Sequence, residues 1–204
     1  TEEGKTVPHA YVGVTGSTIS HFQLTQPEGS FDRTIDGRGK LLMPAFYNAH
    51  AHVPMTLLRG RGDNLPLDRW LNEAIFPFEA HITEDATYHA TLLGIAEMLR
   101  FGVVSFTDMY FCTDARARAV LDSGVKCNLS DCVVCSEPGM TYYDLPLAKE
   151  NEQWIAQYHG AGDGRLLIDM SLHAEYTSTP EVVRTLADAT KAAGLRMQVH
   201  VSET

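Results

Sequence analysis

The 204-residue sequence lacks several features that would each assign it to a class of protein. No apolar run approaches the ~18 residues of a transmembrane helix, which argues against a membrane protein. Its four cysteines are too few and too clustered for the disulfide framework of a small secreted protein. Basic residues are also scarce, since 16 Lys and Arg face 26 Asp and Glu. The net charge of −10 disfavours binding to nucleic acid or an anionic membrane. The sparse cysteines suit a reducing compartment, so we expect a cytoplasmic protein.

Residues from about 7 to 43 have the pattern of short strands separated by turns. Residues 10–14 and 18–22 are rich in β-branched and aromatic side chains, with Gly16 between them. A turn signal at 36–39 precedes the apolar run 41–43, where we expect the next strand to begin. This segment is too small to form a stable sheet alone, so we expect it to have partners elsewhere.

From residue 44 onward, the pattern alternates helices with apolar strands. Helices are predicted over 83–102, 113–124, 147–158 and 179–194, and the later strands over 103–107, 125–134, 166–172 and 196–201. This order predicts an α/β fold with five parallel strands and external helices. An eight-stranded (β/α)8 barrel needs ~250 residues, so the chain would supply about five of its eight strands. A smaller, open doubly wound sheet fits the length as well.

Histidines stand at the ends of the first and fifth predicted strands. His50 and His52 alternate along the first strand, so their side chains point the same way. His200 ends the fifth strand, which faces the first across the mouth of a barrel, and Glu203 follows three residues later. Three imidazoles could share a metal ion that activates water, and a nearby carboxylate could move protons. Each residue taken alone fits an ordinary polar loop residue equally well.

Several blocks of the sequence resemble the amidohydrolase superfamily, in its nucleoside-deaminase and chlorohydrolase branch. They occur in the family's order and are Leu42-Met43-Pro44-Ala45-Phe46-Tyr47-Asn48-Ala49-His50-Ala51-His52, Met55-Thr56-Leu57-Leu58-Arg59-Gly60, Leu65-Pro66-Leu67-Asp68-Arg69-Trp70-Leu71, Thr107-Asp108-Met109-Tyr110-Phe111, His173-Ala174-Glu175-Tyr176-Thr177-Ser178 and His200-Val201-Ser202-Glu203-Thr204. Within this branch, the chain is most similar to the methylthioadenosine/S-adenosylhomocysteine deaminase group. Ordered blocks spread over nearly the whole chain are far more specific than a single pair of histidines.

The resemblance implies a metal-dependent (β/α)8 barrel with a small β-sandwich built from both chain ends. Residues 1–43 would form part of the β-sandwich, and residues 44–204 the first part of the catalytic barrel. The family's barrel also carries a metal-binding histidine on strand six and an aspartate on strand eight. No residue here matches them, so further sequence or a second chain would complete the barrel. We expect these 204 residues to be inactive alone, and homo-oligomers are common in this branch.

The same resemblance implies the roles of six residues. His50, His52 and His200 would bind one divalent metal, with zinc preferred and iron as the alternative. Glu203 would move a proton to the substrate's ring nitrogen while metal-activated hydroxide attacks the amino-bearing carbon and ammonia leaves. Glu79 would hold the ribose hydroxyls and His173 would contact the substrate. The implied partner is a small nucleoside or other amino-heterocycle.

One difference from the family's sequence pattern limits which substrates this chain would accept. Members that accept S-adenosylhomocysteine use arginines near strand three to bind its carboxylate, but no arginine lies between Arg118 and Arg165. Asp131 and Glu137 stand in this region and would repel a carboxylate. A nucleoside with a smaller or uncharged substituent, or a different amino-heterocycle, therefore fits better. The alternatives are a triazine chlorohydrolase, a guanine or cytosine deaminase, or a catalytically incomplete fragment that acts as an interaction module.

Overall fold

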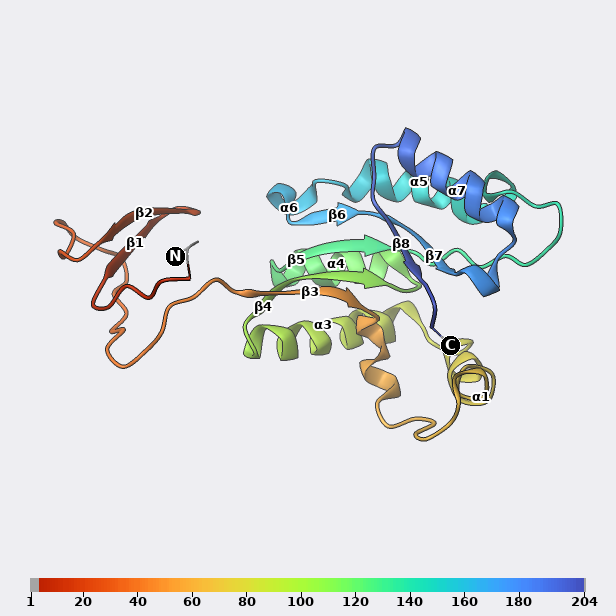
Figure 1. Ribbon diagram of the computed structural model, residues 1–204, viewed down its shortest axis with the longest axis horizontal. Coiled ribbons are helices and arrows are strands. Elements are labelled where there is room, and N and C mark those ends of the chain that lie inside the picture. Colours follow the sequence, from red (N-terminus) through yellow and green to blue (C-terminus); the bar gives the residue numbers. More distant parts are fainter. Residues whose placement is uncertain (1–3, 204) are drawn as a thin grey trace. The chain divides into compact units, whose positions relative to one another are not determined.

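The computed structural model describes residues 4–203, so Thr204, the last residue of the final motif, lies outside the described range. The chain divides into two compact units, Thr1–Met43 and Pro44–Thr204 (Figure 1). The assignment of these units to a β-sandwich and to part of a barrel stays a prediction. Within the described range, none of the helices combines the length and apolar character that crossing a membrane requires.

The first unit contains an antiparallel hairpin of β1 (Tyr11–Thr15) and β2 (Thr18–Gln23). The expected strands at 10–14 and 18–22 are thus present, and Gly16 takes the positive φ of +60° that the tight turn requires. The prediction that a strand begins at residue 41 was wrong. Leu41 and Leu42 are 72% and 75% exposed and belong to no strand, and the first residue that pairs with a neighbouring strand is Phe46, opposite Val103.

The second unit is built on parallel strands. β3 (Phe46–Ala51), β4 (Val103–Met109), β5 (Lys126–Ser130) and β6 (Leu166–Ile168) form one sheet in that order. β7 (Met170–Ala174) pairs in parallel with β8 (Met197–His200), and a bridge between Val133 and Leu172 joins β7 to the chain that follows β5. The expected parallel α/β architecture is therefore present.

Two predicted strands have different bounds in the structure. The strand predicted over 125–134 ends at Ser130, and the strand predicted over 166–172 is divided at Asp169. Asp169 N–H donates to Leu129 O, whereas the next amide, Met170 N–H, donates to Arg196 O. Asp169 thus bonds to β5 and Met170 to the β8 side, and beyond them the chain bonds to the segment after β5, since Val133 N–H donates to Ser171 O. β6 and β7 together occupy the fourth strand position.

The long helices begin and end at the residues that the sequence indicates. α3 (Glu84–Arg100) begins after Thr83, whose hydroxyl accepts from Ala86 N–H, and α7 (Pro180–Ala192) begins after Thr179, which accepts from Val182 N–H. α4 (Thr113–Ser123) ends at Gly124 in the left-handed conformation. With α5 (Pro146–Tyr158), they lie beside the strands (Figure 1). The shorter helical segments are η1 (Val53–Leu58), α1 (Leu67–Arg69), η2 (Trp70–Ile75), α2 (Phe76–Glu79), η3 (Tyr142–Asp144), α6 (Ala161–Gly164) and η4 (Glu175–Thr177).

Between α4 and the sheet lies a buried ion pair of Asp108 and Arg116, both 0% exposed. Arg116 Nη1 donates to Asp108 Oδ2 at 3.0 Å, and Asp108 Oδ1 accepts from Val53 N–H at 2.7 Å. The other guanidinium donors bind Thr113 Oγ1 and the carbonyl oxygens of Tyr110, Phe111 and Ser130. One side chain thereby links the carboxyl ends of β4 and β5 to α4, and Asp108 links them to the start of η1.

We expect Arg116→Met to lower the free energy of unfolding by about 3–5 kcal/mol, because it leaves the Asp108 carboxylate buried without its charged partner. Urea denaturation followed by circular dichroism measures this difference. Arg184→Met is the matched control, since Arg184 pairs with Glu181 on the exposed surface of α7. The control should cost less than about 1 kcal/mol. Equal losses in the two variants would contradict the structural role of Arg116.

Candidate functional site

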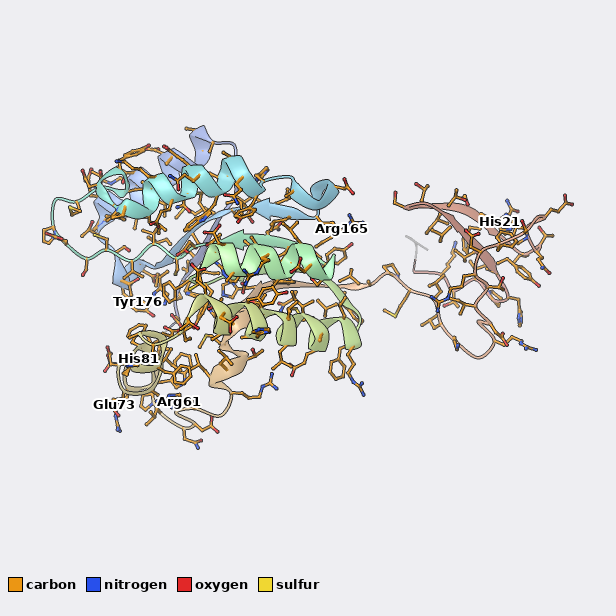
Figure 2. All side chains as sticks on the ribbon, turned by 180° about the vertical axis from the view of Figure 1, so that it is seen from behind. His21, Arg61, Glu73, His81, Arg165 and Tyr176 are labelled. Atoms are coloured by element: carbon orange, nitrogen blue, oxygen red, sulfur yellow. The ribbon has the colours of Figure 1, made fainter. Side chains whose placement is uncertain are left out.

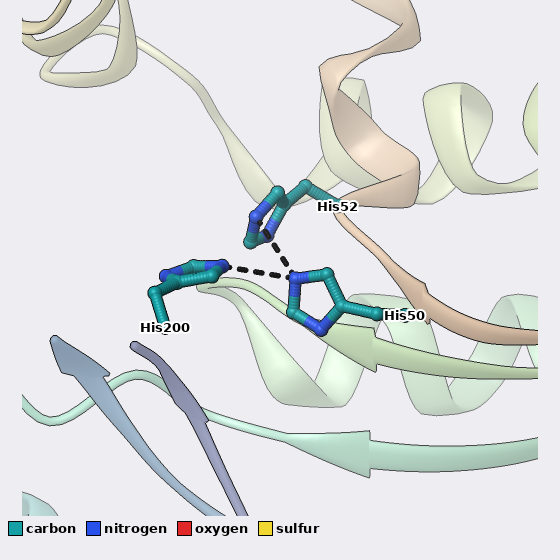
Figure 3. Close-up of side chains that lie close together, drawn as sticks. All are labelled: His50, His52 and His200. Atoms are coloured by element: carbon teal, nitrogen blue, oxygen red, sulfur yellow. Dashed lines mark hydrogen bonds between the residues drawn. The ribbon is translucent and has the colours of Figure 1, made fainter. Parts of the chain in front are cut away.

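Three histidines meet at the carboxyl ends of the parallel strands. His50 lies on β3, His52 directly follows it, and His200 is the last residue of β8 (Figure 3). His50 Nε2 is 2.9 Å from His200 Nε2 and 3.4 Å from His52 Nε2. One nitrogen from each ring lies within 4.8 Å of the others, an arrangement that could hold a metal ion. The structure thus brings together the three residues that the sequence singles out, from the two ends of the strand order.

Hydrogen bonds at the far side of two rings determine which nitrogen is free. His52 Nδ1 is 2.5 Å from the carbonyl oxygen of Met109. A carbonyl oxygen only accepts, so Nδ1 carries the proton and Nε2 presents a lone pair. Burial lowers the pKa of His52, and its histidine neighbours lower it further, which favours the neutral ring at pH 7. His50 Nδ1 likewise lies 3.2 Å from Gln198 Oε1.

This arrangement fits a bound cation better than an empty cluster. With both Nδ1 atoms protonated, the Nε2 lone pairs of His50 and His52 face one another and repel. A divalent ion would accept both lone pairs, and neutral imidazoles are preferred ligands of zinc. His200 contributes the third ring, and its buried Nδ1 has no hydrogen-bond partner among residues 4–203. The donor set therefore matches the chemistry of a zinc-type site.

A row of rings connects this cluster to Glu203. The His173 ring, on β7, lies edge-on to His200 at 5.3 Å between centroids and 6.1 Å from the Tyr176 ring. Tyr176 lies in η4 just beyond β7 (Figure 2). It donates its hydroxyl proton to Glu203 Oε2 at 2.7 Å. Burial and this bond raise the pKa of Tyr176 to about 12, so its hydroxyl stays a donor at neutral pH. Burial lowers the pKa of His173, as does the neighbouring His200.

Glu79, the last residue of α2, lies in an apolar pocket of about 310 Å³. The pocket is lined by Phe76, Glu79, Ala80, Ile82, Tyr110, Phe111 and Cys112. Tyr110 donates its hydroxyl proton to Glu79 Oε1 at 2.7 Å. Burial raises the pKa of Glu79, although the Tyr110 bond opposes the shift. Because Tyr110 directly follows Met109, whose carbonyl contacts His52, the pocket and the histidine cluster share one stretch of backbone.

The sequence did not reveal the partners of these groups. Tyr110 and Tyr176 stand within the resembling blocks but carry no spacing that predicts their bonds to Glu79 and Glu203. Gln198 gave a usable signal, because it precedes His200 by two residues and so shares its face of β8. That position could have predicted a polar neighbour of the histidine cluster.

Comparisons with known proteins identify the family of this chain. The model of the Amidohydrolase family matches residues 41–204. A 5'-deoxyadenosine deaminase from Methanothermobacter thermautotrophicus is 39% identical over 191 residues, which make up 94% of this chain and 44% of that protein. A 5-methylthioadenosine/S-adenosylhomocysteine deaminase from Dictyoglomus thermophilum is 39% identical over 173 residues, 85% of this chain and 40% of that protein. The chain thus spans less than half the length of either relative.

A solved structure shares the fold. The crystal structure of an adenosine deaminase from Xanthomonas campestris with bound zinc has a TM-score of 0.70 and 30% identity, covering 79% of this chain and 37% of that one. The family match over most of the chain and the two relatives at 39% identity lead to one conclusion. This chain belongs to the amidohydrolase family.

Proposed function

We propose that this chain contributes to the active site of a metal-dependent hydrolytic deaminase that acts on adenine-type nucleosides. The observation that carries the proposal is the convergence of His50, His52 and His200, with two Nδ1 atoms engaged so that their Nε2 lone pairs face one point. The names of the two relatives at 39% identity support deamination of adenine nucleosides over triazine hydrolysis or deamination of guanine or cytosine.

The proposed cofactor is one zinc ion per chain, held by His50, His52 and His200. When bound, such an ion lowers the pKa of water to about 7 and acts as a Lewis acid. Zinc is bound in the adenosine deaminase structure with the same fold, which supports zinc over iron. Because the chain covers less than half of each relative, we propose that further strands complete a (β/α)8 barrel and the metal coordination.

Glu203 is the proposed proton carrier. Tyr176 donates a hydrogen bond to Glu203 Oε2 and thereby orients the carboxylate. Oε1 is then left to deliver a proton to the ring nitrogen of the substrate. His173 stands between this carboxylate and the histidine cluster, where its half-buried ring would contact the heterocycle. The lowered pKa of His173 keeps the ring neutral at pH 7, so it neither repels the metal nor competes for the proton.

Glu79 is the proposed ribose-binding residue. A carboxylate can accept hydrogen bonds from two neighbouring hydroxyls, and Tyr110 holds Glu79 in a partly buried position beside the apolar pocket. A nucleoside with a small, uncharged 5' substituent fits this environment better than one with a carboxylate. We therefore propose 5'-deoxyadenosine and methylthioadenosine as the first substrates to assay, using the complete natural protein that carries this sequence.

We expect Glu203→Gln to lower kcat/KM for 5'-deoxyadenosine by about 10²–10⁴-fold, because the amide cannot transfer a proton. Ammonia release measures the rate, and metal analysis of the same sample should show an unchanged zinc content. Glu150→Gln is the control, since Glu150 is an exposed carboxylate on α5, outside the candidate site. A Glu203→Gln enzyme that keeps its wild-type rate would rule out proton transfer by this residue.

We expect Glu79→Ala to reduce kcat/KM for nucleosides by about 10–100-fold, the equivalent of about 1.5–3 kcal/mol for a charged hydrogen bond. Activity on free adenine should change little, because the free base has no ribose to bind. The ratio of the two rates is the measurement. Glu73→Ala, a change to an exposed carboxylate paired with Arg69, should leave the ratio unaltered. A parallel loss on base and nucleoside would argue against ribose binding.

The same two carboxylates should respond to pH in opposite directions. Burial raises the pKa of Glu79 in the folded protein, so its contribution to stability is present at low pH and lost as pH rises through that pKa. The bond to Arg69 lowers the pKa of Glu73, so its contribution is lost as pH falls. Relative to wild type, we expect Glu79→Gln to gain stability as pH rises above about 4.5, whereas the stability that Glu73→Gln lacks at neutral pH should cease to differ from wild type as pH falls below about 4.5. Urea denaturation at several pH values tests the two signs.

A further inference from the structure

Gln198 lies between three strands and bonds two of their side chains. It occupies β8 two residues before His200, on the same face of the strand. Its Oε1 is 3.2 Å from His50 Nδ1 on β3, and its Nε2 donates to Ser130 Oγ on β5 at 3.1 Å. Ser130 Oγ in turn donates to the carbonyl oxygen of Asp108 on β4 at 3.3 Å. One hydrogen-bonded chain therefore crosses from the buried backbone to the histidine cluster.

The donor and acceptor in each of these hydrogen bonds follow from the buried carbonyl oxygen at one end of the series. The Asp108 carbonyl oxygen only accepts, so the single hydroxyl proton of Ser130 points toward it. Ser130 Oγ must then accept from the amide nitrogen of Gln198, which turns the amide oxygen toward His50. An amide oxygen accepts only from N–H, so His50 carries its proton on Nδ1. Its Nε2 keeps a lone pair on the side of His52 and His200.

We propose that Gln198 is a positioning residue, which fixes the tautomer and ring orientation of His50 and thereby increases the affinity of the histidine cluster for a divalent cation. The inference rests on the metal site proposed above. His50 is exposed, so packing alone does not fix its ring. Ser130 is 1% exposed and held by its own bond, which makes it a rigid support for the Gln198 amide. Partners that bond the second nitrogen of a metal-binding histidine raise its basicity and orient it.

The test compares zinc affinity in the full chain, measured by competition with a chelator of known zinc affinity. Gln198→Met keeps the length of the side chain but cannot accept from His50, and we expect zinc affinity to fall about 10–100-fold. Gln198→Glu keeps an oxygen that can accept from His50 Nδ1–H, and the Ser130 hydroxyl can turn from the Asp108 carbonyl oxygen to donate to the second carboxylate oxygen, so we expect affinity at or above the wild-type level. Gln153→Met, on the exposed face of α5, is the control and should bind zinc as wild type does.

A second measurement does not depend on metal. Nitrogen-15 NMR of the metal-free wild-type chain should show His50 protonated at Nδ1, and in Gln198→Met the Nε2-protonated tautomer should gain population. Wild-type His50 protonated at Nε2, or equal zinc affinity in wild type and Gln198→Met, would overturn the inference. So would an equal loss of affinity in the Met and Glu variants, which would make the role one of packing. If His50→Ala binds zinc as tightly as wild type does, that result would instead overturn the metal site itself.

Discussion

The buried ion pair of Asp108 and Arg116 holds the segments that carry the candidate site. Asp108 binds the first amide after His52, and Arg116 binds the carbonyl oxygens of Tyr110 and Ser130. The same backbone segments make contacts within the site. Met109 O contacts His52, the Tyr110 hydroxyl contacts Glu79, and the Ser130 hydroxyl contacts Gln198. A buried ion pair contributes little net stability, because desolvation offsets the attraction. Its role here is geometric, because it fixes the start of η1 and the segments that follow β4 and β5 relative to one another.

The sequence predicted the alternation of helices and strands better than it predicted where individual strands begin and end. Helix starts at Thr83 and Thr179 followed from local capping chemistry, and the parallel strands followed from alternation with helices. The division at Asp169 could not be predicted, because it depends on which neighbouring strand accepts each amide. The apolar run at 41–43 was misleading for a related reason: an apolar composition favours a strand only where a partner backbone is present.

The candidate site, too, could be predicted only in part from the sequence. His50, His52 and His200 could be identified because strand-end position and alternation are local properties of sequence. The roles assigned to Glu79 and Glu203 came only from the family resemblance. Their partners Tyr110 and Tyr176 lie 31 and 27 positions away along the chain, so no local pattern pairs them. The opposite environments of the carboxylates, one half-buried and one exposed, were also absent from the sequence pattern and arise only from packing.

The contact between His50 and His200 constrains the shape of the sheet. β3 and β8 occupy the first and fifth strand positions, and a flat sheet with ~4.8 Å between strands would separate them by about 19 Å. Two imidazole side chains are too short to cover that distance, yet their Nε2 atoms are 2.9 Å apart. The sheet must therefore curve until the side chains of its first and last strands meet on the concave face. Closure of a barrel requires curvature of this kind, which supports the proposal that further strands complete the wall between β8 and β3.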